Sequence, residues 1–197
     1  FEVGSIGCEN VEVEVRGNQK PDEIIVIGAH YDHVGGVAAL ARISGAKVAA
    51  SDTAARAMRS GTAAKDDPQA GFGDEMDFPR IARIEVLEDQ AVIKVGNIEL
   101  TIHHTPGHAP GGSSWTWREC EGERCIDLVY ADSLNAVSHD EYKFTADGGT
   151  GVARFRESIA TLRELPCDLL VSVHPSNSQL FERVSRNGLI DSSACKA

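Results

Sequence analysis

Apolar and polar positions follow patterns that predict short strands and helices along most of the chain. Residues 11–15 alternate with period two, as in a half-exposed strand, and residues 23–28 form a continuous β-branched run, as in a buried strand. The same criteria predict strands near residues 47–50, 81–104 (three short ones), 114–117, 128–130 and 169–173, and helices near residues 37–43, 52–60 and 152–162. The pattern favours a layered α/β fold in one domain, with or without an arm.

Signals at the ends of these segments set several boundaries. Ser51 is a suitable N-cap for the second helix, Gly61 fits its C-terminal end, and Pro166 ends the last helix. Residues 62–79 are rich in Gly, Asp, Pro and Ala and show little periodicity, so we expect a long surface loop there. Loops of that length within a domain often cover a functional site.

The charge balance excludes two classes of partner. The 197 residues include 19 basic and 30 acidic side chains, for a net charge of −11. Nucleic acid and anionic membrane are therefore disfavoured, because there is no surplus of Lys or Arg to replace phosphate counterions. No run approaches 18 consecutive apolar residues, so we expect no membrane-spanning segment.

The five cysteines bear on the cellular compartment. No Cys-x-x-Cys pair is present, which argues against a zinc site built from cysteines. Two disulfides with one cysteine left over is the favoured interpretation, and five reduced, buried thiols are the alternative. Disulfides form in oxidising compartments, so we expect a periplasmic or secreted protein.

Three loops that follow predicted strands carry histidines. They are the loops with His30, Asp32 and His33 after residues 23–28, His108 within residues 105–112, and His174 after residues 169–173. Strand ends build sites in α/β folds because the strand fixes a ligand while the loop can vary. In His-x-Asp-His the first two side chains can face the same way, and His33 turns toward a second position. These side chains suit Zn²⁺, so one short motif can serve two adjacent metals.

Any single histidine is more often a surface or core residue than a metal ligand. We expect that ordinary structural role for His103, His104 and His139. The combined spacing of residues 30–33 after a buried strand favours the metal site instead.

Four spaced motifs resemble the metallo-β-lactamases of class B, third subclass. They are Asp-His-Val-Gly-Gly at 32–36, Thr-Pro-Gly-His-Ala-Pro-Gly-Gly-Ser-Ser-Trp-Thr-Trp at 105–117, Tyr-Ala-Asp-Ser-Leu at 130–134 and Val-His-Pro-Ser at 173–176. The resemblance implies the αβ/βα sandwich of that family, truncated in its N-terminal half. A short N-terminal strand segment, residues 1–28, would replace most of the usual N-terminal half, and residues 29–197 would form the metallo-β-lactamase-like domain.

The resemblance also implies a di-zinc centre. One zinc would bind the first motif histidine together with His30 and His108, and the other would bind Asp32, His33 and His174. A metal-held hydroxide, oriented by Asp32 as a catalytic residue, would attack the carbonyl of a β-lactam, and zinc makes such a nucleophile available near neutral pH. 

Four further features carry over from the same resemblance. Ser133 and Asn135 match positions that contact the substrate carboxylate in relatives, although both can equally be ordinary polar loop residues. Asp132, next to them, can instead be a structural cap. The pairs Cys120/Cys125 and Cys167/Cys195 resemble disulfides of some secreted members.

Two departures from the family pattern change the expectation. The family motif is His-x-His-x-Asp-His, and its first position here is Gly28, which has no side chain to coordinate metal. We therefore expect one tightly bound zinc and a second that is weak or absent. Residues 10–32 also resemble the entry to the metal site of bacterial di-zinc aminopeptidases, so the chain looks like a junction, or chimera, of two zinc-hydrolase families.

The sequence therefore predicts a zinc hydrolase of β-lactamase type that confers antibiotic resistance with reduced activity. The alternatives are a zinc hydrolase of the same fold that acts on another ester, amide or lactone, an aminopeptidase, and a catalytically impaired zinc-binding protein. Because a shortened N-terminal half would leave apolar faces uncovered, we expect a homodimer or higher oligomer, with strands or domains exchanged between chains.

Overall fold

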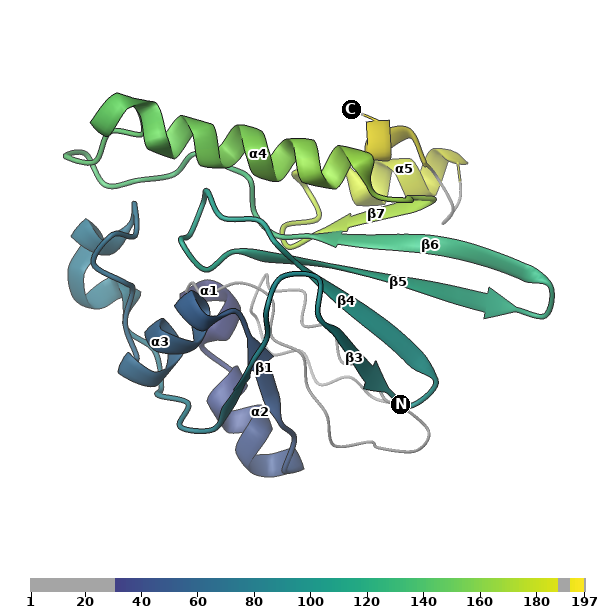
Figure 1. Cartoon of the computed structure of the whole chain (residues 1–197), viewed down its shortest axis with the longest axis horizontal. Coiled ribbons are helices and arrows are strands. Elements are labelled where there is room, and N and C mark those ends of the chain that lie inside the picture. Colours follow the sequence, from purple (N-terminus) through teal and green to yellow (C-terminus); the bar gives the residue numbers. More distant parts are fainter. Residues whose placement is uncertain (1–30, 188–191, 197) are drawn as a thin grey trace.

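The computed structural model describes residues 31–187 and 192–196, and a five-stranded sheet lies at its centre (Figure 1). The strands stand in the order β3-β4-β5-β6-β7. Their bounds are Val92–Val95 for β3, Ile98–His104 for β4, Ser113–Glu121 for β5, Arg124–Ala131 for β6 and Leu169–Ser172 for β7. The first three pairings are antiparallel, and β6 pairs with β7 in parallel.

This topology gathers three loops at one edge of the sheet. Because β4 and β6 are both antiparallel to β5, they run in the same direction, and β7 runs with them. The C-terminal ends of β4, β6 and β7 therefore share one edge. The segments that leave this edge are residues 105–112, 132–135 and 173–176, which include three of the resemblance motifs.

A second, two-stranded parallel sheet lies between the helices and the large sheet. It pairs β1 (Val48–Ala50) with β2 (Ile84–Val86). Val48 and Ala50 pack in one apolar cluster with the helices, whereas Ala49 between them packs in a second cluster with Trp115 and Tyr130 of the large sheet. Successive side chains of a strand point to opposite faces, and a different apolar cluster covers each face of β1. All three residues of β1 are therefore buried.

The helices near β1 are bounded as their sequence predicts. Helix α2 spans Val37–Ser44, and α3 spans Asp52–Ser60. The hydroxyl of Ser51 accepts a hydrogen bond from the Ala54 N–H at the start of α3, and Gly61 adopts a left-handed conformation after its end.

The remaining elements are short, with one exception. Their bounds are Tyr31–Val34 for α1, Ala70–Met76 for the 3-10 helix η1, Asp147–Gly149 for η2, Thr150–Glu164 for the long helix α4, Leu180–Asn187 for α5 and Ser192–Lys196 for η3. Figure 1 shows α4 and α5 together near β7, with α1, α2 and α3 grouped around β1.

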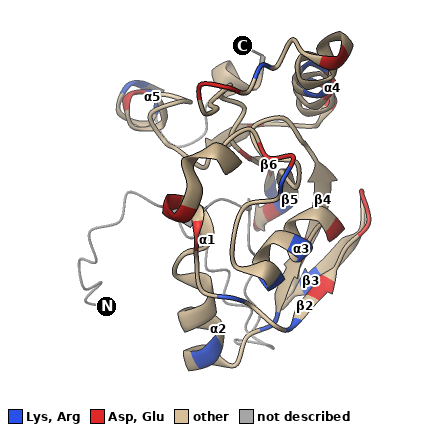
Figure 2. Cartoon of the chain, turned by 90° about the vertical axis from the view of Figure 1, so that its left-hand side faces the viewer, with Lys and Arg blue, Asp and Glu red and all other residues tan. Residues whose placement is uncertain are grey.

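None of the described helices is long and apolar enough to cross a membrane. Figure 2 shows acidic and basic positions interspersed on the face that it presents.

Two sequence expectations are corrected by the structure. Residues 62–79 are not simply a surface loop, because they contain η1 and bury Asp67, Gln69, Met76 and Phe78. The apolar positions at helical spacing in residues 152–162 predict that Ile159 is buried, but it is 40% exposed. Helix α4 instead buries Ser158, whose hydroxyl donates to the carbonyl of Pro106. The helix packs on the loop 105–112. Its buried face therefore includes the polar residue Ser158 and is not formed by apolar residues alone.

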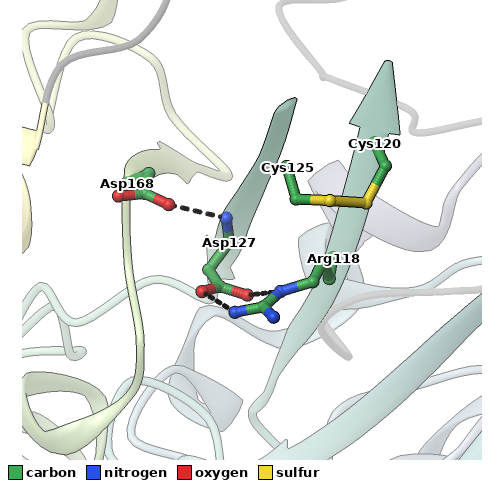
Figure 3. The surroundings of a disulfide bond; sticks show 5 residues. All are labelled: Arg118, Cys120, Cys125, Asp127 and Asp168. Carbon is green, nitrogen blue, oxygen red and sulfur yellow. Dashed lines mark hydrogen bonds and ion pairs between the residues drawn. A yellow bond between two sulfur atoms is a disulfide. The ribbon is translucent and has the colours of Figure 1, made fainter. Parts of the chain in front are cut away.

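Both expected disulfides are present. Cys120–Cys125 joins β5 to β6 at the tip of their hairpin, and Cys167–Cys195 joins the segment before β7 to η3. Figure 3 shows that the first disulfide lies near the ion pair between Arg118 and Asp127. The backbone N–H of Asp127 also donates to the carboxylate of Asp168. The hydrogen bond and charge of Arg118 lower the pKa of Asp127. These contacts tie β5, β6 and the start of β7 together.

The two disulfides should differ in their effect on stability. In the chain-entropy account, a crosslink stabilises more when it closes a longer loop, which gives about 3.5 kcal/mol for the longer loop and about 2 kcal/mol for the shorter one. The sequence separations are 28 and 5 residues. The double variant Cys167→Ser/Cys195→Ser should therefore lower the urea midpoint more than Cys120→Ser/Cys125→Ser does. Equal losses would show that loop closure is not the main contribution.

The predicted strands at 11–15 and 23–28, together with Gly28, His30 and Cys8, lie outside the described residues. The domain division at residue 28 therefore stays a prediction, as do the oligomeric state and the compartment.

Candidate metal centre

Two histidines that are far apart in sequence meet at the sheet edge. His33 lies on α1, whose next residue, Val34, is completely buried in the helix cluster. His174 follows β7. Their Nε2 atoms are 3.2 Å apart, and their rings are 5.1 Å apart between centroids with planes tilted by 56°.

The spacing of these two nitrogen atoms suits a shared cation. Two imidazoles bound at about 2.0–2.1 Å to a tetrahedral Zn²⁺ hold their nitrogen atoms about 3.3 Å apart. The observed 3.2 Å between His33 Nε2 and His174 Nε2 matches that geometry. The chemistry of this donor pair therefore fits zinc.

His108 is oriented by a backbone carbonyl of a neighbouring loop. Its Nδ1 lies 2.7 Å from the carbonyl oxygen of Asn135, and since a carbonyl only accepts, Nδ1 carries the hydrogen. In a neutral ring the lone pair is then on Nε2. Metal-binding histidines usually have this arrangement, because the bond to the second nitrogen fixes both the tautomer and the ring orientation.

The Nε2 atom of His108 faces a residue that sequence reasoning did not identify. The amide nitrogen of Gln69 is 3.3 Å away and donates to it. Gln69 is only 7% exposed, and its backbone N–H is bonded to the carboxylate of Asp67. The one available signal was its position in the long segment 62–79, which was expected to cover a site.

Two glycines let the loop 105–112 pack tightly. A Cβ added at Gly111 would be 2.5 Å from the backbone nitrogen of Ala54 in α3, and one added at Gly112 would be 2.7 Å from the carbonyl oxygen of Thr105. The loop is closed by the bond from the Thr105 N–H to the carbonyl of Gly112, and the Ser51 hydroxyl donates to the carbonyl of Gly111. These contacts hold the loop that carries His108 against the first turn of α3.

Asp132 has a structural role, as the sequence allowed. Its carboxylate accepts from the backbone N–H groups of Ser113 and Ser133, at 3.0 and 2.9 Å, and it is 4% exposed. Ser133 is equally buried, whereas Asn135 is exposed and contributes its carbonyl to His108. The carboxylate therefore joins the start of β5 to the loop after β6.

The full ligand set is not tested by the structure. Among the described side chains, no three His, Cys, Asp or Glu residues come together in a group able to hold a metal. His30 lies outside the described residues, and nothing is described of the side chain of Asp32. The set His30, Asp32, His33, His108 and His174 therefore stays a prediction, as do the roles of Ser133 and Asn135 toward substrate.

The three other histidines make structural contacts. Nε2 of His103 lies 2.8 Å from the Thr116 hydroxyl, and Nε2 of His104 lies 3.2 Å from the carbonyl of Leu87. The ring of His139 lies beside Tyr142, at 6.3 Å between centroids. These contacts agree with the structural roles expected for all three.

Burial of His103 predicts one pH effect. Desolvation lowers the pKa of His103 below its ordinary value of 6.5, and the nearby charge of Asp89 only partly opposes this. Because the unfolded chain then takes up the proton first, the stabilisation from neutral His103 is complete above pH 6.5 and is lost as the pH falls through the lowered pKa. His103→Gln should flatten the fall in melting temperature below pH 6.5. An unchanged pH profile would contradict this assignment.

The sequence of this chain matches a known protein family over most of its length. The sequence model of the metallo-beta-lactamase superfamily matches residues 10–174, so the chain belongs to that superfamily. Both the family resemblance and the predicted fold are thereby confirmed.

Solved structures of metallo-β-lactamases are similar to this chain. Rm3 metallo-beta-lactamase is 42% identical, with a TM-score of 0.82, over 89% of this chain and 67% of that one. MEM-A1, a subclass B3 metallo-beta-lactamase from a soil metagenome library, is 37% identical, with a TM-score of 0.81, over 89% and 69%. MIM-2 metallo-beta-lactamase is 46% identical, with a TM-score of 0.77, over 86% and 61%. The chain thus spans about two thirds of the length of these relatives. The likeness of residues 10–32 to aminopeptidases stays a prediction.

Proposed function

We propose that this chain is a zinc-dependent β-lactamase. The observation that carries the proposal is the 3.2 Å separation of His33 Nε2 and His174 Nε2 at the edge where the loops after β4, β6 and β7 meet. Its similarity to solved proteins described as metallo-β-lactamases, one of them of subclass B3, supports the same activity.

Each residue of the site would have a distinct task. His33 and His174 would hold zinc together with Asp32, and His30 and His108 would hold a second zinc. Bound zinc supplies a nucleophile from water near neutral pH and polarises a carbonyl. The carbonyl of Asn135 keeps the proton on His108 Nδ1 and the lone pair on Nε2, which would bind zinc in place of the hydrogen bond from the Gln69 amide. Ser133 and Asn135 lie on the loop after β6, where they would bind the substrate carboxylate.

Hydrolysis of nitrocefin by the full chain tests the proposal. We expect turnover that a chelator abolishes and that added zinc restores, with zinc content measured in the same samples. Absence of turnover in protein that demonstrably contains zinc would contradict the β-lactamase activity. Hydrolysis of an ester or lactone by the same sample would then favour another hydrolase of this fold.

Loss of the first motif histidine should limit both zinc content and rate. Gly28 offers no ligand, so we expect fewer than two zinc ions per chain. The variant Gly28→His should raise zinc content and nitrocefin turnover together, whereas Gly28→Ala, as the matched control, should change neither. A rise in zinc content without a rise in turnover would instead favour the alternative of a catalytically impaired zinc-binding protein.

The oligomeric state and the compartment belong to the same proposal. We expect a homodimer or higher oligomer, and a periplasmic or secreted location, which the two disulfides favour. Light scattering coupled to size exclusion measures the first directly, and a monomer at micromolar concentration would contradict it.

A further inference from the structure

The guanidinium of Arg183 on α5 is buried without enough partners. The side chain is 5% exposed, and its Nη2 donates to the carbonyl of Leu170 at 2.6 Å. Its Nε and Nη1 atoms are buried and have no hydrogen-bond partner among the described residues. A buried cation with unpaired N–H groups destabilises a fold unless an anion or acceptor compensates it.

Arg183 lines a cavity of about 630 Å³ behind the His174 loop. The cavity lies between the C-terminal ends of β6 and β7 on one side and α5 and η3 on the other. Apolar walls come from Leu134, Leu170, Val173 and Ala194. Cavities of this size and mixed lining are typical of sites for small organic molecules.

A second unpaired polar group lines the same cavity. The hydroxyl oxygen of Ser133, on the loop after β6, is buried and has no hydrogen-bond partner within the part of the chain that the structure describes. Two unsatisfied polar groups from separate elements therefore meet one cavity. Most buried polar groups in folded proteins are paired, so this coincidence indicates a ligand that supplies the missing partners.

The charges around the cavity select the sign of that ligand. Arg186, one turn along α5, also lines it, which adds a second cation. The one acidic side chain among the lining residues is Asp132, whose two oxygen atoms already accept from Ser113 N–H and Ser133 N–H. In a chain of net charge −11, this pocket is locally basic and suits an anion.

We propose that this cavity binds a small organic carboxylate, with its carboxylate on the Arg183 guanidinium and its apolar body against Leu134, Leu170 and Val173. Arginine pairs well with carboxylates because its N–H groups match the two carboxylate oxygen atoms. The Ser133 hydroxyl donates to the same group, and Arg186 adds long-range attraction. The cavity shares Ser133, Asn135 and His174 with the site proposed above, but its anchor Arg183 and its apolar walls belong to neither the metal-binding nor the substrate-binding set, so the inference goes beyond the β-lactamase proposal.

Calorimetry on the full chain tests the site without reference to turnover. Benzoate should bind, acetate should bind more weakly because it lacks the apolar body, and inorganic phosphate should bind least. The titrations are performed with zinc-loaded protein and again after chelation and dialysis, and both should give the same order. Tighter binding of phosphate than of benzoate would overturn the proposed ligand class, and loss of benzoate binding on removal of zinc would place the ligand on the metal instead.

Substitutions at the cavity locate the binding. Arg183→Lys keeps the charge and a donor for the Leu170 carbonyl, and it should weaken benzoate binding about tenfold because it removes the guanidinium. Arg186→Gln should weaken it less. Arg163→Gln, on an exposed position of α4, is the matched control and should leave binding unchanged. Unchanged affinity in Arg183→Lys would overturn the proposal.

A crystallographic measurement covers the case in which Arg183 variants fail to fold. Crystals of the unmodified chain grown with 4-bromobenzoate should give a bromine anomalous peak among Leu134, Leu170 and Val173. A peak elsewhere, or none, would overturn the site.

Discussion

Replacing His174 with alanine should remove bound zinc and lower nitrocefin turnover by about a hundredfold or more, because even groups that only orient a metal ligand change affinity by 10–100-fold. His174 Nε2 and His33 Nε2 lie 3.2 Å apart at the sheet edge. Loss of one imidazole leaves the other without the geometry that fits a tetrahedral ion. The paired variant His33→Ala should have an effect of the same order. Zinc content by mass spectrometry and turnover are the two measurements.

His104→Ala is the control for this prediction. His104 also lies at the end of a strand, but its Nε2 atom is bonded to the Leu87 carbonyl and not to the site. It should keep both zinc and turnover. If His174→Ala retained full zinc content, or if His104→Ala lost as much zinc, the site would lie elsewhere.

A side chain at Gly111 should damage both the fold and the site. The added Cβ would be 2.5 Å from the nitrogen and 2.8 Å from the Cα of Ala54, and because both are backbone atoms of α3, either the helix or the loop must move. Overpacking of this kind costs about 1–3 kcal/mol. Gly111→Val should therefore lower the urea midpoint and also lower zinc content, since the loop carries His108.

Gly45→Asn is the matched control for the glycine prediction. Gly45 caps α2 with φ of 76°, and a Cβ there would meet nothing within 4 Å. Asparagine tolerates this left-handed conformation, so stability should change little. A Gly111→Val protein as stable as Gly45→Asn, with its zinc retained, would show that the loop does not depend on contact with α3.

Local sequence signals predicted most of the described elements. The Ser51 cap and the Gly61 stop gave the limits of α3, because both act through contacts within one or two turns. The strand patterns within residues 81–104 and at residues 114–117 predicted β4 and β5, because the residue pattern of a half-buried strand reflects its own packing.

Features set by tertiary contacts were missed. Helix α1 is only four residues long, too short for a periodic signal, and it is fixed by the burial of Val34. The burial of Ser158 in place of Ile159 depends on the Pro106 carbonyl, which lies 52 residues away. Gln69 was missed because an amide in a loop carries no pattern before the loop is folded onto His108.

The candidate site was predicted in part. Histidines after three predicted strands indicated a common edge, and the parallel course of β4, β6 and β7 explains why His108 and His174 lie at that edge. The partner of each ring nitrogen was not accessible from sequence, because the Asn135 carbonyl and Gln69 amide reach His108 only in the folded chain. The burial of Arg183, with two of its guanidinium nitrogen atoms unpaired, could not be predicted from the sequence either, because an arginine on a polar helix normally faces water.

Diffraction from zinc-soaked crystals at the zinc absorption edge tests the central claim most directly. The account predicts an anomalous peak about 2.0–2.1 Å from both His33 Nε2 and His174 Nε2. Absence of a peak between these two nitrogen atoms, in crystals whose zinc is bound somewhere else or not at all, would contradict it.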